Sequence, residues 1–207
     1  MRRCAAIVAV LTAVLVAACQ PEVRTEVLIL GDSITVEASD EIVAAFNGVG
    51  ADAYRYLPAI AAHGGQGLTF VGDEVPADRV DAFWSAHMRS LIEQAPGTIV
   101  VELGVNDCAR LQGVGWYGQR IDNLMAQVPA ETTVRWVTIA DPRRRVCDTS
   151  LNSALLAATY RWANLKLLPW ARLANSHPEW FSDGVHHTVE GQRAFAAFLK
   201  SQLDRVA

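Results

Sequence analysis

Short, mostly apolar segments alternate along this chain with segments in which apolar residues recur every three or four positions. Residues 27–30, 98–103 and 133–140 have the length and composition of strands that are buried on both faces. Residues 53–57 and 165–170 are shorter strand candidates. The pattern therefore predicts buried strands separated by helices.

The segments between these strands have helical spacing. The clearest helix is expected over residues 78–94, where a regular apolar stripe ends at Pro96-Gly97. Further helical segments are expected over 36–47, 117–127, 151–164 and 171–176, and a last helix after Thr188, a suitable N-cap. Alternation of this kind predicts an α/β three-layer sandwich, in which a parallel sheet is flanked by helices on both faces.

The first 25 residues differ from the rest of the chain. Arg2 and Arg3 precede an apolar run over 5–18 that is typical of an export signal and too short for a comfortable membrane span. Val16-Ala17-Ala18-Cys19 resembles the bacterial lipobox, in which the cysteine is lipidated and becomes the mature N-terminus. An ordinary signal peptide with a chance cysteine is the alternative.

We therefore expect a signal peptide over 1–18, a lipidated tether over 19–25 and one domain over 26–207. Lipid chains on Cys19 would anchor that domain to the outer face of a bacterial membrane without a spanning helix.

Two cysteines, Cys108 and Cys147, lie within the predicted domain. Because an exported domain meets an oxidising compartment, we expect them to form a disulfide. Two cysteines without histidines at matching spacing make a poor zinc site, and neither a metal nor a cofactor is expected.

The charge of the chain argues against nucleic acid as its partner. Lys and Arg number 18 against 22 Asp and Glu, which gives a formal net charge of −4. The one basic cluster, Arg143-Arg144-Arg145, is short, and we interpret it as a solvated loop rather than a contact for an anion or polysaccharide.

Candidate chemistry stands in three short blocks. Gly31-Asp32-Ser33 follows the strand at 27–30, Gly104-Val105-Asn106-Asp107 follows the strand at 98–103, and Asp183-Gly184-Val185-His186 precedes the last helix. In open α/β sheets, ligands bind at the carboxyl ends of the strands, so polar blocks there can form one site.

Together these blocks contain what acyl transfer through a serine requires. Ser33 is a candidate nucleophile, and Asp183 and His186 are close enough in sequence for one turn to present both toward it. The N–H of Ser33, a glycine N–H and the Asn106 amide could bind the oxyanion that the attack creates.

In this order and spacing, the three blocks resemble the nucleophile, G-x-N-D and D-x-x-H blocks of the SGNH or GDSL-type hydrolases. Thr188-Val189-Glu190-Gly191 also looks like the continuation of that family after its histidine. The resemblance extends over essentially the whole predicted domain, and it implies the flavodoxin-like SGNH hydrolase fold.

The resemblance also implies a role for each matching residue. Ser33 would be the nucleophile, His186 the general base and Asp183 its orienting acid. The oxyanion hole would be formed by the N–H of Ser33, the Asn106 amide and a loop glycine, for which the family's spacing selects Gly67.

Several other residues are weighed as candidates but are not expected to form the triad. Gly65 is the alternative to Gly67 as the oxyanion donor. Asp32 and Asp107 are expected to bond within their own loops, and His63 and His187 to be bystanders. His87, within the apolar stripe of the helix at 78–94, is expected at the edge of the core rather than as a ligand.

The family splits acyl esters, so we expect an exported, monomeric serine esterase whose substrate is a small acyl ester or an O-acetylated glycan. The segment from Asp141 to Asp183 is similar to SGNH domains of bacterial cell-surface O-acetyltransferases, so acyl transfer to a glycan by the same triad is an alternative. A non-catalytic binding lipoprotein is a second alternative, which the complete set of Ser, His and Asp disfavours.

Overall fold

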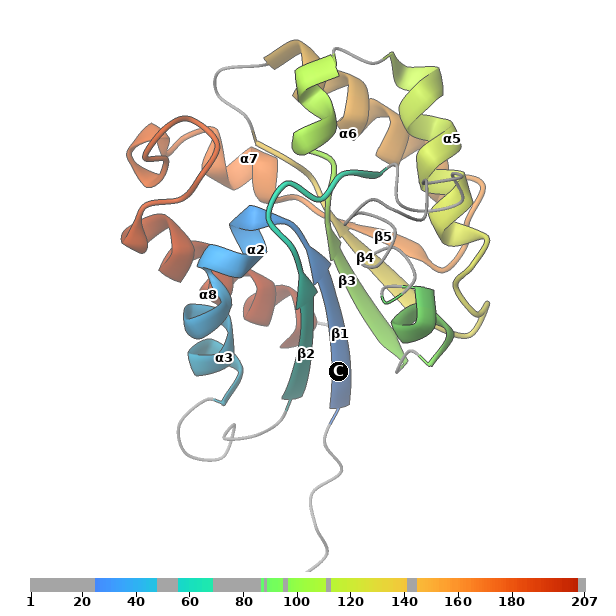
Figure 1. The fold of residues 1–207 in the computed structure, drawn as a ribbon, viewed down its shortest axis with the longest axis horizontal. Coiled ribbons are helices and arrows are strands. Elements are labelled where there is room, and N and C mark those ends of the chain that lie inside the picture. Colours follow the sequence, from blue (N-terminus) through green and yellow to red (C-terminus); the bar gives the residue numbers. More distant parts are fainter. Residues whose placement is uncertain are drawn as a thin grey trace, which may run out of the picture.

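The computed structural model describes residues 25–47, 56–68, 87, 89–94, 97–110, 113–140 and 145–204. Within these ranges, five strands form one parallel sheet in the order β2-β1-β3-β4-β5 (Figure 1). The strands are β1 (Thr25–Gly31), β2 (Tyr56–Ala62), β3 (Thr98–Glu102), β4 (Thr133–Val137) and β5 (Leu165–Leu168). This is the flavodoxin-like order, in which ligands bind where the order reverses, between β1 and β3.

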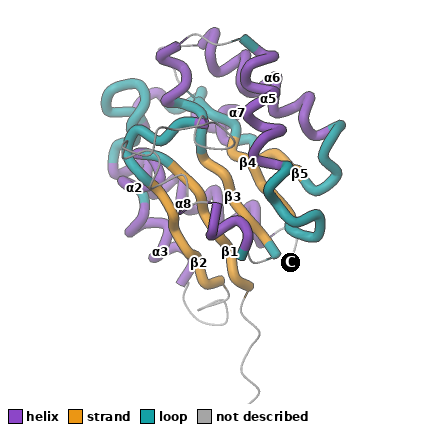
Figure 2. The backbone as a smooth tube through the Cα atoms, turned by 45° about the vertical axis from the view of Figure 1, so that its right-hand side comes forward, coloured by secondary structure: helices purple, strands orange, loops and turns teal. Residues whose placement is uncertain are grey.

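Helices cover both faces of the sheet, as Figure 2 shows in a second view. On one face lie α3 (Ser39–Asn47), α7 (Trp170–Ala174) and α8 (Val189–Asp204), and on the other α5 (Val114–Met125) and α6 (Arg145–Thr159). Three short elements, α2 (Ser33–Glu37), η3 (Asn106–Arg110) and η4 (Pro178–Trp180), belong to the loops at the sheet edge. The predicted α/β three-layer architecture is therefore confirmed.

β1 shows why both faces need cover. Successive side chains of a strand point to opposite faces, and here both sets are apolar. Leu28 and Leu30 join the core under α5 and α6, whereas Val27 and Ile29 join the core under α3 and α8. All four are at most 2% exposed, so β1 has no face left for water.

Several helix boundaries differ from those expected. The helix predicted over 36–47 begins at Ser33 and is two helices, α2 and α3, separated at Ala38. α6 begins at Arg145 rather than at residue 151, so its first turn includes Cys147, which a disulfide joins to η3. Of the helix predicted over 78–94, the structure describes residue 87 and residues 89–94, and it is helical at 87 and over 89–93.

Strand boundaries differ too. β4 ends at Val137 rather than at residue 140, because the side-chain amide of Asn152 takes the place of a neighbouring strand at Ile139. The Ile139 N–H donates to Asn152 Oδ1 at 3.0 Å, and Asn152 Nδ2 donates to the Ile139 carbonyl at 2.9 Å. β2 begins at Tyr56 and runs to Ala62, later than the predicted 53–57, of which residues 53–55 lie outside the described part.

Three further predictions lie outside the described residues: the signal peptide over 1–18, lipidation of Cys19 with the tether to residue 24, and the solvated loop at Arg143 and Arg144. In the part of the chain that the structure describes, no helix has the length and apolar character needed to cross a membrane.

A disulfide joins Cys108 of η3 to Cys147 of α6, with Cα atoms 5.3 Å apart. Both cysteines are buried, and the Tyr117 hydroxyl lies 3.1 Å from Cys147 Sγ. Next to it, Gly104 has φ +126°, and a Cβ there would collide with the Leu151 side chain of α6. The loop after β3, which carries Asn106, is thus held tightly against α6.

Replacing both Cys108 and Cys147 by alanine should lower the free energy of unfolding by up to about 4 kcal/mol, because the bond closes a loop between residues 39 positions apart. Denaturant unfolding of the variant and of the oxidised wild type measures the difference. Equal unfolding free energies, or free thiols on Cys108 and Cys147 in the unfolded wild type without reductant, would contradict the disulfide.

Candidate active site

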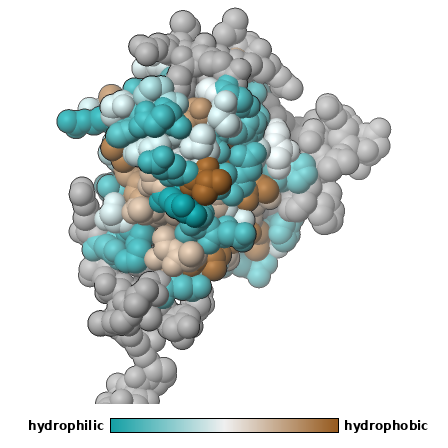
Figure 3. Space-filling view, turned by 90° about the vertical axis from the view of Figure 1, so that its left-hand side faces the viewer, coloured by the Kyte–Doolittle hydropathy of each residue, from teal (hydrophilic) through white to brown (hydrophobic). Residues whose placement is uncertain are grey.

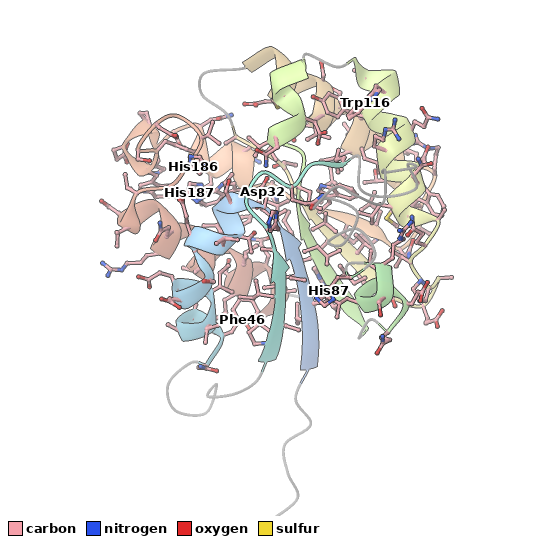
Figure 4. All side chains as sticks on the ribbon, viewed as in Figure 1. Asp32, Phe46, His87, Trp116, His186 and His187 are labelled. Atoms are coloured by element: carbon pink, nitrogen blue, oxygen red, sulfur yellow. A yellow bond between two sulfur atoms is a disulfide. The ribbon has the colours of Figure 1, made fainter. Side chains whose placement is uncertain are left out.

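The three polar blocks meet at the carboxyl edge of the sheet. Ser33 is the first residue of α2, directly after β1, and Asn106 is the first residue of η3, after β3. The loop between η4 and α8 brings Asp183 and His186 to the same edge. Figure 4 shows Asp32 at the end of β1 beside His186 and His187 of this loop.

Ser33, His186 and Asp183 form a continuous chain of hydrogen bonds. Ser33 Oγ lies 3.0 Å from His186 Nε2, although the two residues are 153 positions apart in the sequence. On the other side of the ring, His186 Nδ1 lies 2.9 Å from Asp183 Oδ2. This is the arrangement in which an imidazole can take a proton from a serine hydroxyl while a carboxylate holds its tautomer.

Asp183 also shapes the loop that carries the histidine. Its Oδ1 accepts hydrogen bonds from the backbone N–H of Val185 at 2.9 Å and of His186 at 2.8 Å. Gly184 between them has φ +85°, which suits a glycine. One carboxylate therefore fixes both the backbone turn and the imidazole, which explains the three-residue spacing of the D-x-x-H block.

The same contacts set the charge of the pair. The hydrogen bond from His186, with those from the two backbone N–H groups, lowers the pKa of Asp183 below its ordinary range. The hydrogen bond to Asp183 raises the pKa of His186, against the opposing effect of partial burial. The side chains of His186 and Asp183 are 35% and 49% exposed, so water reaches both of them.

Asn106 is held from two sides. Its Nδ2 donates to Asp32 Oδ2 at 3.0 Å and to the Gln66 carbonyl at 2.9 Å. The amide thus lies between the loop after β1 and the glycine-rich loop after β2. An oxyanion bound to Asn106 Nδ2 would have to replace one of these two acceptors. The Ser33 N–H is a second donor for an oxyanion, because the first N–H groups of a helix such as α2 have no partner within the helix.

Residue 67 of the glycine-rich loop has no room for a side chain. A Cβ on Gly67 would come within 2.8 Å of Asp107 Oδ1, and the other oxygen of Asp107 accepts the Leu68 N–H at 2.7 Å. Asn106 binds the carbonyl side of the Gln66–Gly67 peptide, so the Gly67 N–H of this trans peptide points the other way. Its role as an oxyanion donor therefore stays a prediction.

Two further acidic residues belong to this edge: Glu102, which the sequence did not single out, and Asp32, for which it predicted only a loop-bonding role. Glu102, the last residue of β3, is 2% exposed and accepts a hydrogen bond from Thr35 Oγ1 at 2.9 Å. Asp32 caps α2 by accepting the Ile34 N–H at 2.9 Å, as a loop-bonding residue should, but it also binds Asn106. A lone acidic residue in the apolar run 99–103 was the available signal for Glu102.

His187 is a core residue, and its ring supports the loop of His186. It is 4% exposed and lies between Trp170, Phe181 and Phe195, with ring centroids 5.2 to 5.4 Å apart. Burial, with the neighbouring charge of His186, lowers the pKa of His187 to about 4. His87, in contrast, is exposed rather than at the edge of the core.

His187→Phe should remove an acid-sensitive step in stability. A buried neutral histidine stabilises the fold above pH 6.5, the ordinary pKa, and that stability is lost as the pH falls toward 4, by up to about 3 kcal/mol. Unfolding free energies of wild type and variant between pH 4 and 7 measure this. A wild-type profile as flat as that of the variant would contradict it.

The described residues contain no group of three or more His, Cys, Asp or Glu placed to hold a metal ion.

Comparisons with known proteins identify the family and the fold. Residues 29–194 match the model of the GDSL-like lipase/acylhydrolase family. No curated protein sequence matches the chain.

Three solved structures share the fold. The C-terminal catalytic domain of Streptococcus pneumoniae peptidoglycan O-acetyltransferase A with a methylsulfonyl adduct is 16% identical, with a TM-score of 0.64, and the match covers 88% of this chain and 94% of that one. TesA is 18% identical, with a TM-score of 0.65 and coverage of 88% of this chain and 100% of that one. The Pseudoalteromonas esterase EstA inhibited by monoethylphosphonate is 15% identical, with a TM-score of 0.65 and coverage of 87% of this chain and 97% of that one.

Proposed function

This chain belongs to the GDSL-like lipase/acylhydrolase family, and on that premise we propose that it is a serine esterase that cleaves acyl esters through an acyl-Ser33 intermediate. The observation that carries the proposal is the hydrogen-bonded chain Ser33–His186–Asp183. A protein that only binds a ligand has no need of that chain.

In the first half-reaction, Ser33 Oγ attacks the ester carbonyl carbon and its proton passes to His186 Nε2. Asp183 stabilises the imidazolium that results. The carbonyl oxygen becomes an oxyanion that the Ser33 N–H and the Asn106 amide can bind. The intermediate collapses when the bond to the alcohol oxygen breaks, and His186 returns the proton to that oxygen.

In the second half-reaction, a water molecule replaces the alcohol. His186 takes a proton from the water as it attacks the acyl-serine, and it then returns this proton to Ser33 Oγ as the acid departs. The exposure of His186 and Asp183 supports water as the acceptor, because the base can be reached from solvent.

We infer that the acyl group is short, such as an acetyl group on a small molecule or a glycan. Figure 3 shows the left-hand side of the view in Figure 1, where polar and apolar surface are interspersed. The described residues of α2, α3, α7 and α8 expose four large apolar side chains: Val36, Val43, Leu173 and Val189. The open setting of the triad supports a short acyl group, because the His186 and Asp183 side chains are 35% and 49% exposed, whereas a long chain needs a deep apolar pocket.

Covalent labelling tests the proposal directly. We expect p-nitrophenyl acetate to be hydrolysed, and phenylmethylsulfonyl fluoride to stop hydrolysis while adding one label that peptide mass spectrometry places on Ser33. A label elsewhere, or full activity after complete labelling, would contradict it. An O-acetylated sugar formed when a glycan acceptor is added would identify the transferase alternative instead.

We further propose that the enzyme is exported and anchored through Cys19 at the outer face of a bacterial membrane. The support is the signal-like segment over 1–18 and the lipobox-like Val16-Ala17-Ala18-Cys19. Mass spectrometry of the mature N-terminus should find a lipidated Cys19, and Cys19→Ser should release the protein from membranes. An unmodified N-terminus beyond Cys19 would exclude the anchor.

A further inference from the structure

Two acidic side chains lie buried together beneath Ser33 and Asn106. Asp32 follows β1 and Glu102 ends β3, and they are 0% and 2% exposed. Gly31 pairs with Glu102 across the two strands, so the residue after Gly31 is necessarily beside Glu102. The two carboxyl groups lie close enough to share a hydrogen bond, which lowers the pKa of Asp32 and raises that of Glu102.

Such a bond needs a proton, because two carboxylates have no hydrogen to share and repel each other when buried. The other donors decide which group is the anion. Asp32 accepts from the Ile34 N–H and from Asn106 Nδ2, whereas Glu102 accepts from the Thr35 hydroxyl and the Asp32 N–H. Each oxygen of Asp32 faces an N–H that can only donate, whereas Glu102 Oε2 faces a hydroxyl, which can also accept a hydrogen bond, so the proton lies on Glu102.

Burial favours a neutral acid in this pair. It is the largest cause that raises both pKa values, that of Asp32 to about 7 and that of Glu102 well above its ordinary value. A neutral Glu102 at neutral pH is thus the state that agrees with the hydrogen bonds.

We propose that Glu102 is a positioning residue of the oxyanion hole: as a neutral acid it donates to Asp32, and Asp32 in turn orients the Asn106 amide. This inference rests on the proposed esterase function. It gives the buried acid of β3 a part in catalysis without any contact to the substrate. It also explains why Asp32 does more than cap α2.

Loss of this proton should release Asn106. A second buried carboxylate would push Asp32 away from Glu102 and place a further negative charge near the developing oxyanion. Other titratable groups also face the pair. The charges of His186, in the loop before α8, and of Asp107, in η3, act on Asp32. His187 and Glu102 both line an internal cavity of about 10 Å³. Activity should therefore decline at alkaline pH through Glu102, separately from the acid limb that His186 sets.

Two replacements of Glu102 separate positioning from packing. Glu102→Gln keeps the shape and a donor toward Asp32 but cannot ionise, whereas Glu102→Leu offers no donor. For p-nitrophenyl acetate, we expect Glu102→Leu to lower kcat by about 10- to 100-fold with KM changed by less than about threefold. Glu102→Gln should keep kcat within about threefold of wild type and lose the alkaline decline.

Equal impairment of the two variants, or an alkaline limb in Glu102→Gln identical to that of wild type, would overturn the proposal. If Glu102→Leu does not fold, the pH profile of Glu102→Gln decides alone.

A readout without activity keeps this test apart from that of the esterase function. The carboxyl ¹³C resonance of Glu102, assigned as the signal missing in Glu102→Gln, should report a protonated acid at pH 7. A resonance typical of a carboxylate at pH 7 would overturn the shared proton. If no ester is hydrolysed at all, the esterase proposal fails while this measurement still judges the Glu102–Asp32 pair.

Discussion

Ser33→Ala is expected to lower kcat/KM for p-nitrophenyl acetate by at least about 10⁴-fold. The Oγ atom is both the attacking atom and the donor to His186 Nε2, at 3.0 Å, so no remaining group can form the acyl intermediate. The fold should be unaffected, because Ser33 is only partly buried and α2 keeps its cap, in which Asp32 accepts the Ile34 N–H. Steady-state kinetics of purified variant and wild type, with circular dichroism of both, test this.

Ser176→Ala is the matched control. Ser176 is also exposed to solvent, and its hydroxyl donates only to a backbone carbonyl at the end of α7. Its kcat/KM should equal that of wild type. Comparable rates for Ser33→Ala and Ser176→Ala would remove Ser33 from the mechanism.

Asp183→Asn should lower kcat by about 10³-fold and shift the pH profile. An amide at residue 183 no longer offers a charged acceptor to His186 Nδ1, so the tautomer that leaves Nε2 free is no longer favoured. The effect should be smaller than for a buried triad acid, because the Asp183 side chain is 49% exposed and water can replace part of its interaction.

The sign of the pH shift follows from the role of His186 as a base. Activity requires neutral His186 and therefore rises as the pH increases through the pKa of this residue. The hydrogen bond to Asp183 raises that pKa, so the wild-type acid limb should lie above that of an ordinary histidine. Without the carboxylate the pKa falls, and the acid limb of Asp183→Asn should move to lower pH.

Glu179→Gln is the control for this shift. Glu179 Oε1 is 2.7 Å from the Nδ1 atom of another histidine, His177, a few residues away on the same segment. Its removal should leave the acid limb in place. Profiles of kcat/KM against pH for the three proteins decide the matter, and an acid limb that Asp183→Asn leaves unmoved would contradict the assignment of Asp183.

Much of this molecule could be predicted from its sequence because the relevant signals are local. The apolar run at 27–30 indicates a strand with no exposed face, and β1 is such a strand. Thr188 indicates the start of the last helix, and its hydroxyl accepts the Gly191 N–H at 3.2 Å. The three polar blocks could be recognised because each keeps its residue types within a few positions, and the order of the strands then brings them together.

What only the tertiary structure decided concerns pairs of groups that lie far apart in the chain. Periodicity says that Glu102 is in a strand, but its partner depends on which strand lies beside β3, and that strand is β1 with Asp32 at its end. The burial of His187 likewise depends on Trp170 and Phe195, which α7 and α8 bring to it. Even Ser33, the nucleophile of the proposed mechanism, is an ordinary serine at the end of a strand until the fold places His186 beside it. The reason is physical: a side chain's own sequence neighbours set its backbone conformation, whereas its protonation and hydrogen bonds are set by whichever groups the packed sheet brings within about 3 Å.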